Sequence, residues 1–275
     1  MRDDRLHPRQ TSTVPASPEP PDRPPARAPR EAVQRWRLVL TRTPLAGEIG
    51  QREHLAAWDQ SLAASGLPVA GLDATPPKAR FAPAAPLSAS IPGEAELADV
   101  WLTERVPAWR ARERIAASVP EGYGLVDAYD VWLGAPALPG QVSASVYRAT
   151  FAPGAVDADA LRLAVDALLR ADALPRERQK GTTTVSYDLR PFLDTLVVDE
   201  RDGCLRMTLR HDPERGIGRP EEVLAALGEQ LGAGLEPSSL VRESLVLAVP
   251  PPPAATGPRP RSSRQPVTPA SRARK

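Results

Sequence analysis

Strand-like and helix-like patterns of apolar residues follow one another in the same order in both halves of this chain. In the first half, residues 36–41 alternate between apolar and more polar side chains, which is typical of a half-buried strand. Leu55, Trp58 and Leu62 then share one face of a helix that is expected to end at Ser65-Gly66. A strand followed by an amphipathic helix is therefore predicted.

The remaining patterns of the first half complete a unit with two helices. Residues 67–72 are interpreted as a short strand, and a proline-rich excursion follows over 74–92. Alternating residues predict strands over 97–105 and 123–133, and Pro107 lies near the start of the helix between them. The resulting order is strand, helix, strand, strand, helix, strand.

The second half repeats that order. Residues 143–151 are a strand candidate, and Asp157 can cap the helix that follows. A turn signal within 193–209 predicts a hairpin, Pro220 suits the first position of a second helix, and 241–249 closes as a strand. This is the split βαβ order, so we predict an α+β fold of two tandem ferredoxin-like (βαββαβ) units.

Composition separates these units from the two ends of the chain. Proline makes up 33 of the 275 residues, and much of it lies in 1–34 and 250–275, which have no core-forming apolar run. Such Pro/Arg-rich segments bury too little apolar surface to offset their ordering entropy, so both are predicted to be disordered tails. The predicted ferredoxin-like units therefore span 35–140 and 141–249.

Charge is distributed unevenly between the core and the C-terminal tail. Residues 35–249 contain 23 Lys and Arg against 29 Asp and Glu, a net charge of −6, which disfavours a broad nucleic-acid surface. The tail has six basic residues and no acidic one, so it could contact RNA or an acidic partner, or simply keep the chain soluble. The basic residues are Arg259, Arg261, Arg264, Arg272, Arg274 and Lys275.

Residues that commonly carry chemistry are scarce. The chain has one cysteine, Cys204, and three histidines, His7, His54 and His211, too few for an iron–sulfur cluster or a closed zinc site. Phosphate-loop, dinucleotide and nucleophile-elbow motifs are missing as well. We therefore expect no metal and no cofactor, assign no catalytic residue, and favour a non-enzymatic protein over an enzyme.

Targeting segments are also missing from the sequence. The N-terminal residues lack the apolar run of a secretory signal, and no stretch reaches the ~20 apolar residues of a membrane span. A cytoplasmic protein without a membrane partner is expected.

A cationic segment in the second half is the first candidate binding site. Arg176, Arg178 and Lys180 alternate, which places three cations on one face of an extended segment, and Tyr187 and Arg190 follow. Such a face could hold phosphates or RNA, with the tyrosine as a stacking platform. The alternative is an exposed strand edge that its cations protect against aggregation.

The loop before the last predicted helix is the second candidate. Arg215 and Arg219 flank two glycines and lead to Pro220 at a helix N-terminus, where backbone amides can bind an anion. The proline removes one amide donor, and the side chains of Glu221 and Glu222 repel an anion. A plain loop is therefore favoured.

Other notable side chains are given structural roles. Asp188 and Arg190 are expected on one strand face, where they can pair. An RNA-modifying enzyme that uses them with His54 for acid–base chemistry is the least favoured hypothesis. The five tryptophans are expected in the core. They are Trp36, Trp58, Trp101, Trp109 and Trp132.

Short strings along the core resemble the radical SAM-associated family of unknown function DUF2344. They are RLVLTRT, GQREHL and SGLP within 37–68, RFAP and APL within 80–87, VSYDLRP at 185–191, and RPEEVL at 219–224. Their order and spacing cover about 35–249. The first half departs from the family pattern, because GQRE stands at 50–53 in place of a Gly-His-Leu-Asp-like string, and 72–77 lack the Phe and His of a Gly-Phe-His-Pro string.

The resemblance implies a partner role and supplies no known reaction. Members of the family are encoded beside, or fused to, a radical SAM protein. We therefore expect an accessory protein that docks a radical SAM enzyme or presents its substrate. The alternative is an RNA-binding module, because tandem ferredoxin-like units often carry RNA on their sheets. The oligomeric state is left open.

Overall fold

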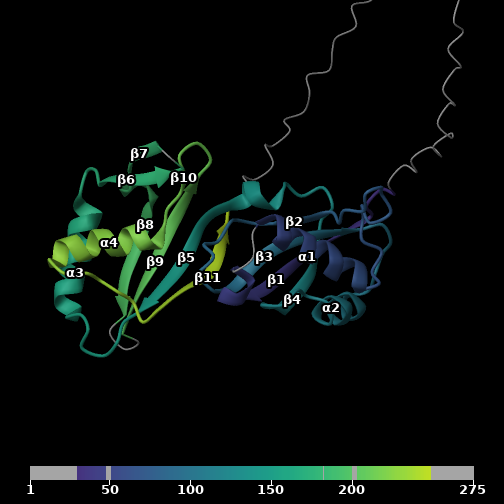
Figure 1. The fold of residues 1–275 in the computed structure, drawn as a ribbon, viewed down its shortest axis with the longest axis horizontal. Coiled ribbons are helices and arrows are strands. Elements are labelled where there is room, and N and C mark those ends of the chain that lie inside the picture. The colour runs from purple at the N-terminus through teal and green to yellow at the C-terminus, as the bar shows by residue number, and fades with distance from the viewer. Residues whose placement is uncertain (1–29, 48–50, 182, 200–202, 249–275) are drawn as a thin grey trace, which may run out of the picture.

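The structure is a computed structural model that describes residues 30–47, 51–181, 183–199 and 203–248. Within these residues it combines four α-helices with a nine-stranded, mostly antiparallel sheet and a separate two-stranded sheet, which confirms the α+β class (Figure 1). Residues 1–29 of the predicted N-terminal tail, the whole predicted basic tail 250–275, and the turn residues 201 and 202 lie outside the described residues. None of the described helices is long and apolar enough to cross a membrane.

The elements follow the alternation seen in the sequence. The strands are β1 (Gln34–Arg42), β2 (Phe81–Pro83), β3 (Gly93–Leu102), β4 (Tyr123–Val131), β5 (Val142–Thr150), β6 (Pro175–Lys180), β7 (Thr183–Asp188), β8 (Leu193–Asp199), β9 (Cys204–Asp212), β10 (Gly216–Ile217) and β11 (Ser239–Leu247). The α-helices are α1 (Gln51–Ala64), α2 (Ala108–Ala116), α3 (Ala158–Arg170) and α4 (Pro220–Leu231). Short 3-10 helices are η1 (Pro44–Gly47), η2 (Leu138–Gln141) and η3 (Arg190–Phe192).

One sheet runs through both halves of the chain. In the first half the strand order is β4-β1-β3, and β2 also pairs with β3. In the second half the order is β11-β5-β9, and both β8 and β10 pair with β9. Neighbours within each half are antiparallel. The halves meet where β11 runs parallel to β3, with Arg242 paired to Gly93.

Several expected elements form where their end signals predict. The Asp157 side chain accepts a hydrogen bond from the backbone N–H of Ala160 at 2.8 Å and caps α3. Pro220 is the first residue of α4, and Gly232 ends that helix in the left-handed conformation with a φ of 65°. Gln34, assigned to the N-terminal tail, is instead the first residue of β1.

The strand expected at 67–72 does not form. Gly71 has a φ of 89°, which turns the chain, and an isolated bridge joins Val69 to Leu102 on β3. The short strand β2, inside the proline-rich excursion, pairs with β3 over three residues. A positive-φ glycine therefore overrides the apolar run that suggested a strand.

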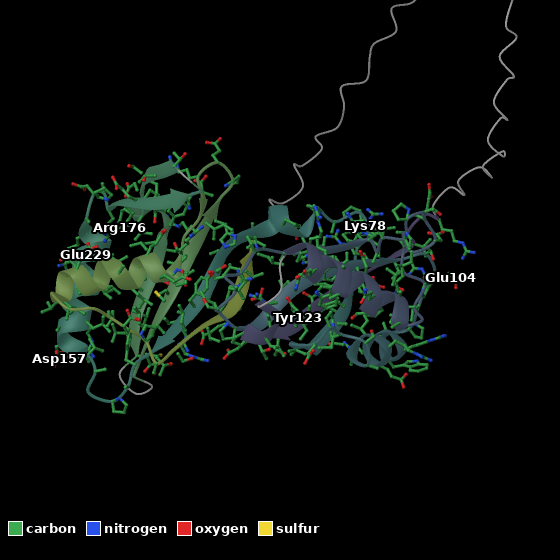
Figure 2. All side chains as sticks on the ribbon, in the orientation of Figure 1. Lys78, Glu104, Tyr123, Asp157, Arg176 and Glu229 are labelled. Carbon is green, nitrogen blue, oxygen red and sulfur yellow. The ribbon has the colours of Figure 1, made fainter. Side chains whose placement is uncertain are left out.

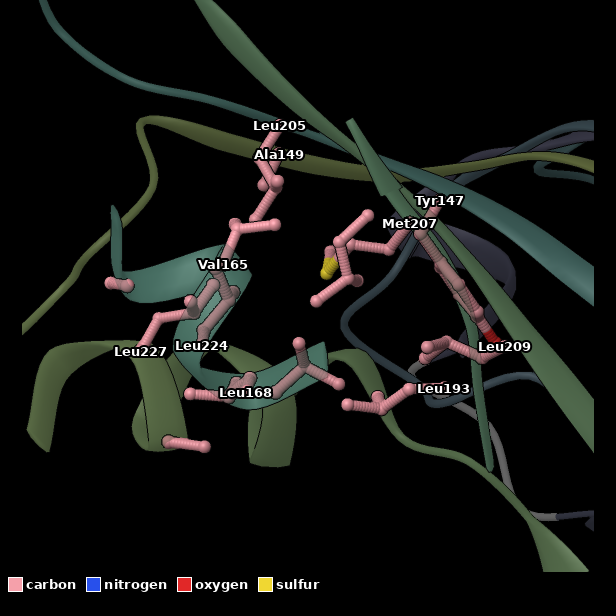
Figure 3. Close-up of a cluster of buried hydrophobic side chains, with 14 of the residues drawn as sticks. Tyr147, Ala149, Val165, Leu168, Leu193, Leu205, Met207, Leu209, Leu224 and Leu227 are labelled. Carbon is pink, nitrogen blue, oxygen red and sulfur yellow. The ribbon is translucent and has the colours of Figure 1, made fainter. Parts of the chain in front are cut away.

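Each half encloses its own apolar core beneath its helices. In the first half Trp36, Leu38 and Leu40 on β1 pack with Trp58 and Leu62 from α1. In the second half α3 and α4 pack against β5, β8 and β9 (Figure 3). Its central side chains are Tyr147, Ala149, Val165, Leu168, Leu193, Leu205, Met207, Leu209, Leu224 and Leu227. Burial explains the positions of Trp58 and Leu62 on α1 and the apolar faces of α3 and α4, whereas Leu55, expected on the same face of α1, is 37% exposed.

A buried ion pair lies where the halves meet. Arg242 is fully buried, its Nε donates to Glu96 Oε1 at 2.7 Å, and its Nη2 also contacts that carboxylate. Arg242 Nη1 donates to the carbonyl oxygen of Pro86 at 2.8 Å. From the other side, Arg42 Nη1 donates to the carbonyl oxygen of Ser88 at 3.0 Å. The two arginines thereby hold the segment 84–91, in the last part of the proline-rich excursion, against the sheet.

A second buried ion cluster lies on the helix-free face of the first half. Asp99 is fully buried and accepts hydrogen bonds at 2.9 Å from the Nε atoms of both Arg35 and Arg37. Arg35 Nη1 also donates to the carbonyl oxygen of Ala135 at 2.7 Å. The connection after β4 is thus fastened across this face of the sheet.

A histidine at the end of β9 is held in its neutral form. Ser145 is fully buried, and its Oγ lies 2.8 Å from His211 Nε2. Burial, followed by the nearby charge of Arg242, lowers the pKa of His211 from 6.5 to about 4.

Replacing Arg242 by alanine should destabilise the fold by about 3–5 kcal/mol, because it leaves the Glu96 carboxylate buried without its cation. The free energy of unfolding from urea titration measures this loss. Arg170→Ala is a matched control, since Arg170 pairs with Asp166 at an exposed position on α3, and its loss should cost at most about 1 kcal/mol. Equal losses for the two variants would contradict the role given to Arg242.

The low pKa of His211 predicts a loss of stability in mild acid. Since the pKa is lower in the folded than in the unfolded chain, the unfolded chain binds the proton first as pH falls from 6.5 to about 4. The loss should be about 2 kcal/mol after allowance for partial exposure. His211→Gln should remove this dependence in urea titrations at both pH values, whereas His54→Gln should remove less. An unchanged dependence in His211→Gln would contradict the prediction.

Candidate functional site

Two tryptophans that were expected in the core are exposed instead. Trp109 is 68% exposed and Trp132 is 77% exposed, whereas Trp36, Trp58 and Trp101 are buried as expected. The side chains of α2 that are buried are Ala111 and Ile115. Trp109 is six residues from Ile115. At about 100° per residue, their side chains point about 120° apart around the helix, so the two do not share a face. That spacing was the signal in the sequence that the expectation overlooked.

The two exposed tryptophans belong to neighbouring parts of the first half. Trp109 is the second residue of α2, and Trp132 directly follows β4. The Gln34 side chain links these places, because its Nε2 donates to the carbonyl oxygen of Val106 at 3.2 Å and to Asp130 Oδ2 at 2.9 Å. The start of α2 and the end of β4 are therefore held together.

Further apolar side chains are exposed along β4 and just after it. Val126 is exposed at an irregularity in the pairing with β1, and Tyr129 and Leu133 are exposed further on. Within the described strands, β4 ends the sheet order and pairs with β1. We call Trp109, Trp132, Leu133 and the exposed side of β4 the tryptophan edge.

The predicted cationic residues lie on the hairpin of β6 and β7. Arg176 Nη1 lies 2.8 and 2.9 Å from the two carboxylate oxygens of Glu229 on α4 (Figure 2). The Arg178 guanidinium lies over the Tyr187 ring, 5.3 Å from its centroid, and Lys180 ends β6. The expected extended segment therefore forms, and one of its cations is committed to a helix of the same chain.

Arg190 binds backbone carbonyls in the second half. Its Nη2 donates to the carbonyl oxygen of Leu169 at 2.8 Å and its Nε to that of Ala171 at 3.2 Å, at the end of α3. Asp188 Oδ1 accepts from the backbone N–H of Leu174 at 2.7 Å and of Arg190 at 3.0 Å. Both side chains have structural roles, although their charged groups are engaged elsewhere rather than with each other.

The hypothetical acid–base trio is not brought together. His54 lies on α1 in the first half, where its Nε2 is 3.0 Å from the hydroxyl of Tyr123. Asp188 and Arg190 belong to the second half, at the far end of the molecule from α1 (Figure 1). Among the described residues, no group of three or more His, Cys, Asp or Glu side chains could hold a metal ion.

The loop with Arg215 and Arg219 is organised by local contacts. Asp212 Oδ1 accepts from the backbone N–H groups of Glu214 and Arg215, both at 2.9 Å, and these hydrogen bonds lower its pKa. A Cβ at Gly218 would lie 2.9 Å from the Cβ of Phe192, so this glycine permits close packing. Arg219 is exposed at the start of α4. These contacts support the plain-loop alternative.

Comparison with known families agrees with the resemblance seen in the sequence. The model of the family described as an uncharacterized protein conserved in bacteria (DUF2344) matches residues 35–220. That region runs from β1 to the first residue of α4 and includes parts of both halves of the sheet. No match was found among the curated proteins. Because the matched region covers more than half of the 275 residues, the chain belongs to the DUF2344 family.

Proposed function

We propose that this chain is a non-enzymatic accessory protein of the cytoplasm, which docks a radical SAM enzyme or presents that enzyme's substrate. The tryptophan edge is the single observation that carries the proposal. The class of partner comes from the resemblance of the sequence strings to the radical SAM-associated family.

Large exposed aromatic side chains are typical of protein interfaces. Tryptophan, tyrosine and arginine are enriched there, and each aromatic residue can bury 150–250 Å². Burial of the exposed parts of Trp109 and Trp132 would contribute roughly 5–9 kcal/mol at ~25 cal/mol per Å², before the costs of association. Exposed Arg110 is next to Trp109 in the sequence. A surface of this kind suits a protein partner with an apolar patch.

The position of the edge strand supports the same proposal. A strand at the end of a sheet presents unpaired backbone N–H and C=O groups, to which a partner strand can be added. β4 is such a strand in the described sheet, and the tryptophans lie at one of its ends. In the middle of β4 the backbone of Ala128 is already bound, because its carbonyl oxygen accepts from Arg112 Nε at 2.9 Å and its N–H donates to Asp127 Oδ1 at 2.7 Å. A partner strand would therefore pair with β4 near the tryptophans, beyond Ala128. Backbone pairing and aromatic anchors could therefore act on one partner together.

We further propose that each half is a ferredoxin-like unit. The order β4-β1-β3-β2 in the first half, and β11-β5-β9-β8 in the second, support this proposal, since the first and third strands of each unit are central. The predicted boundaries of the two units, 35–140 and 141–249, are part of this proposal. Two such units on one sheet provide a long platform for an accessory role.

RNA binding by the tandem units is the second candidate function. The observation that favours it is the Arg178 guanidinium, which lies over the Tyr187 ring on the β6–β7 hairpin, 5.3 Å from the ring centroid. The basic C-terminal tail and the remaining cations Arg176, Lys180 and Arg190 would add to it. The ion pair between Arg176 and Glu229 and the hydrogen bonds of Arg190 to backbone carbonyl oxygens weigh against it.

Replacing both Trp109 and Trp132 by serine should reduce recovery of a radical SAM protein from the native cell by at least about tenfold. Affinity purification of the tagged full chain, with protein and RNA measured in the same eluate, tests this expectation. Leu163→Ser is the matched control, because Leu163 is 72% exposed on α3 in the other half. Stability should change little in all variants, since the replaced side chains are exposed.

Two outcomes would contradict the docking proposal. One is failure of the unaltered chain to recover a radical SAM protein, and the other is equal recovery by the double variant. Enriched RNA that is lost at higher salt, without a radical SAM partner, would favour the second candidate instead.

A further inference from the structure

A cavity of about 490 Å³ lies in the first half, between α1, η1, β3 and the segment 84–91. Its aromatic wall is built from Trp58 and Phe81, which stack with ring centroids 4.5 Å apart, and from Tyr123, whose ring lies edge-on at 5.2 Å from that of Trp58. This volume falls within the range of small-molecule sites, which are mostly apolar with a few polar groups.

The cavity is closed on one side by a backbone contact. A Cβ added to Gly47 in η1 would lie 2.0 Å from the carbonyl oxygen of Ala89. Only glycine permits this approach of η1 to the segment 84–91. Gly47 and Ala89 both line the cavity. Their contact therefore completes the wall formed by segment 84–91, which Arg42 and Arg242 attach to the sheet.

The cavity wall contains one positive charge without a matching negative charge. Arg42 is only 9% exposed, and among the described carboxylates none forms an ion pair with it. The Glu96 carboxylate in the same wall is neutralised by Arg242. The contacts of Arg42 are hydrogen bonds from Nη1 to carbonyl oxygens, at 3.0 Å to Ser88 and 3.4 Å to Ile91. A buried cation of this kind favours an anion beside it.

The other polar groups of the wall are uncharged donors and acceptors. Burial raises the pKa of Tyr123 above 10, so its hydroxyl stays protonated. Burial and the charge of Arg42 lower the pKa of His54, so its imidazole is neutral at pH 7. The pair of Tyr123 and His54 can therefore hydrogen-bond a ligand without adding or cancelling charge.

We propose that this cavity binds a small organic anion, whose carboxylate or phosphate lies against Arg42 and whose flat apolar body packs on Phe81 and Leu55. Tyr123 and His54 provide further hydrogen bonds to its polar end. The inference goes beyond the docking function and is independent of it, because the tryptophan edge contributes no residue to the cavity.

Isothermal titration calorimetry with indole-3-acetate and its neutral counterpart indole-3-acetamide tests the proposal on the full chain. We expect the acid to bind at least tenfold more tightly than the amide. Leu55→Trp, which fills the cavity from a side chain that is 37% exposed, should weaken binding of the acid at least tenfold. Leu163→Trp, at an exposed leucine of the other half, should leave it unchanged.

Variants of Arg42 test the role of its positive charge separately. Arg42→Gln should bring the affinities of acid and amide to within about twofold of each other, whereas Arg42→Lys should retain the preference for the acid. Unfolding curves establish that each variant is folded before titration. No binding of the acid by the unaltered chain at millimolar concentration, equal binding of acid and amide, or equal effects of Leu55→Trp and Leu163→Trp would each overturn the proposal.

Discussion

The buried pair of Arg242 and Glu96 is the contact on which the arrangement of the two halves depends. The halves share a sheet through a single pairing of β11 with β3, and Arg242 is the residue that pairs there with Gly93. Its backbone N–H also donates to the carbonyl oxygen of Pro92 at 2.9 Å. Arg242 thus fixes the register of β11 against β3 through its backbone and pairs with Glu96 through its side chain. Since removing both charges from water is costly, the pair specifies one arrangement more than it adds stability.

The charged side chains on the helix-free face of the sheet are largely paired within the chain, which sets the exposed aromatic residues apart from them. In the first half, the connection after β4 lies across this face and satisfies Arg35. In the second half, Arg148 and Arg206 are directly opposite each other on β5 and β9, and both pair with Glu243. Charges on this face are therefore largely compensated within the chain. Residues 35–249 carry a net negative charge, and many of their arginines already bind a carboxylate or a carbonyl oxygen of the same chain.

Local signals in the sequence were sufficient for the helix ends and for most strands. Asp157 and Pro220 act within one turn of their own helices, so their effects need no knowledge of the rest of the fold. The exposure of Trp109 could have been predicted from its six-residue spacing to Ile115, whereas that of Trp132 depended on which neighbours the fold supplies, and aromatic content alone gave the wrong expectation. The cavity could not be foreseen, since its wall joins residues from 40 to 139. Likewise, Arg176 meets Glu229 across 53 residues and Arg242 meets Glu96 across 146, distances that periodicity does not report.

The fastening of the segment 84–91 has a consequence for how this family can diversify. Arg42 and Arg242 bind the backbone carbonyl oxygens of that segment, and a carbonyl is the same whichever side chain its residue carries. Ala85, Pro86, Leu87 and Ala89 can therefore be exchanged without breaking the attachment, provided that the backbone keeps its path. Because these residues also line the cavity, mutation can reshape the pocket wall while the anchoring arginines stay fixed. The shape of the cavity wall is thereby separated from the attachment of the segment to the sheet.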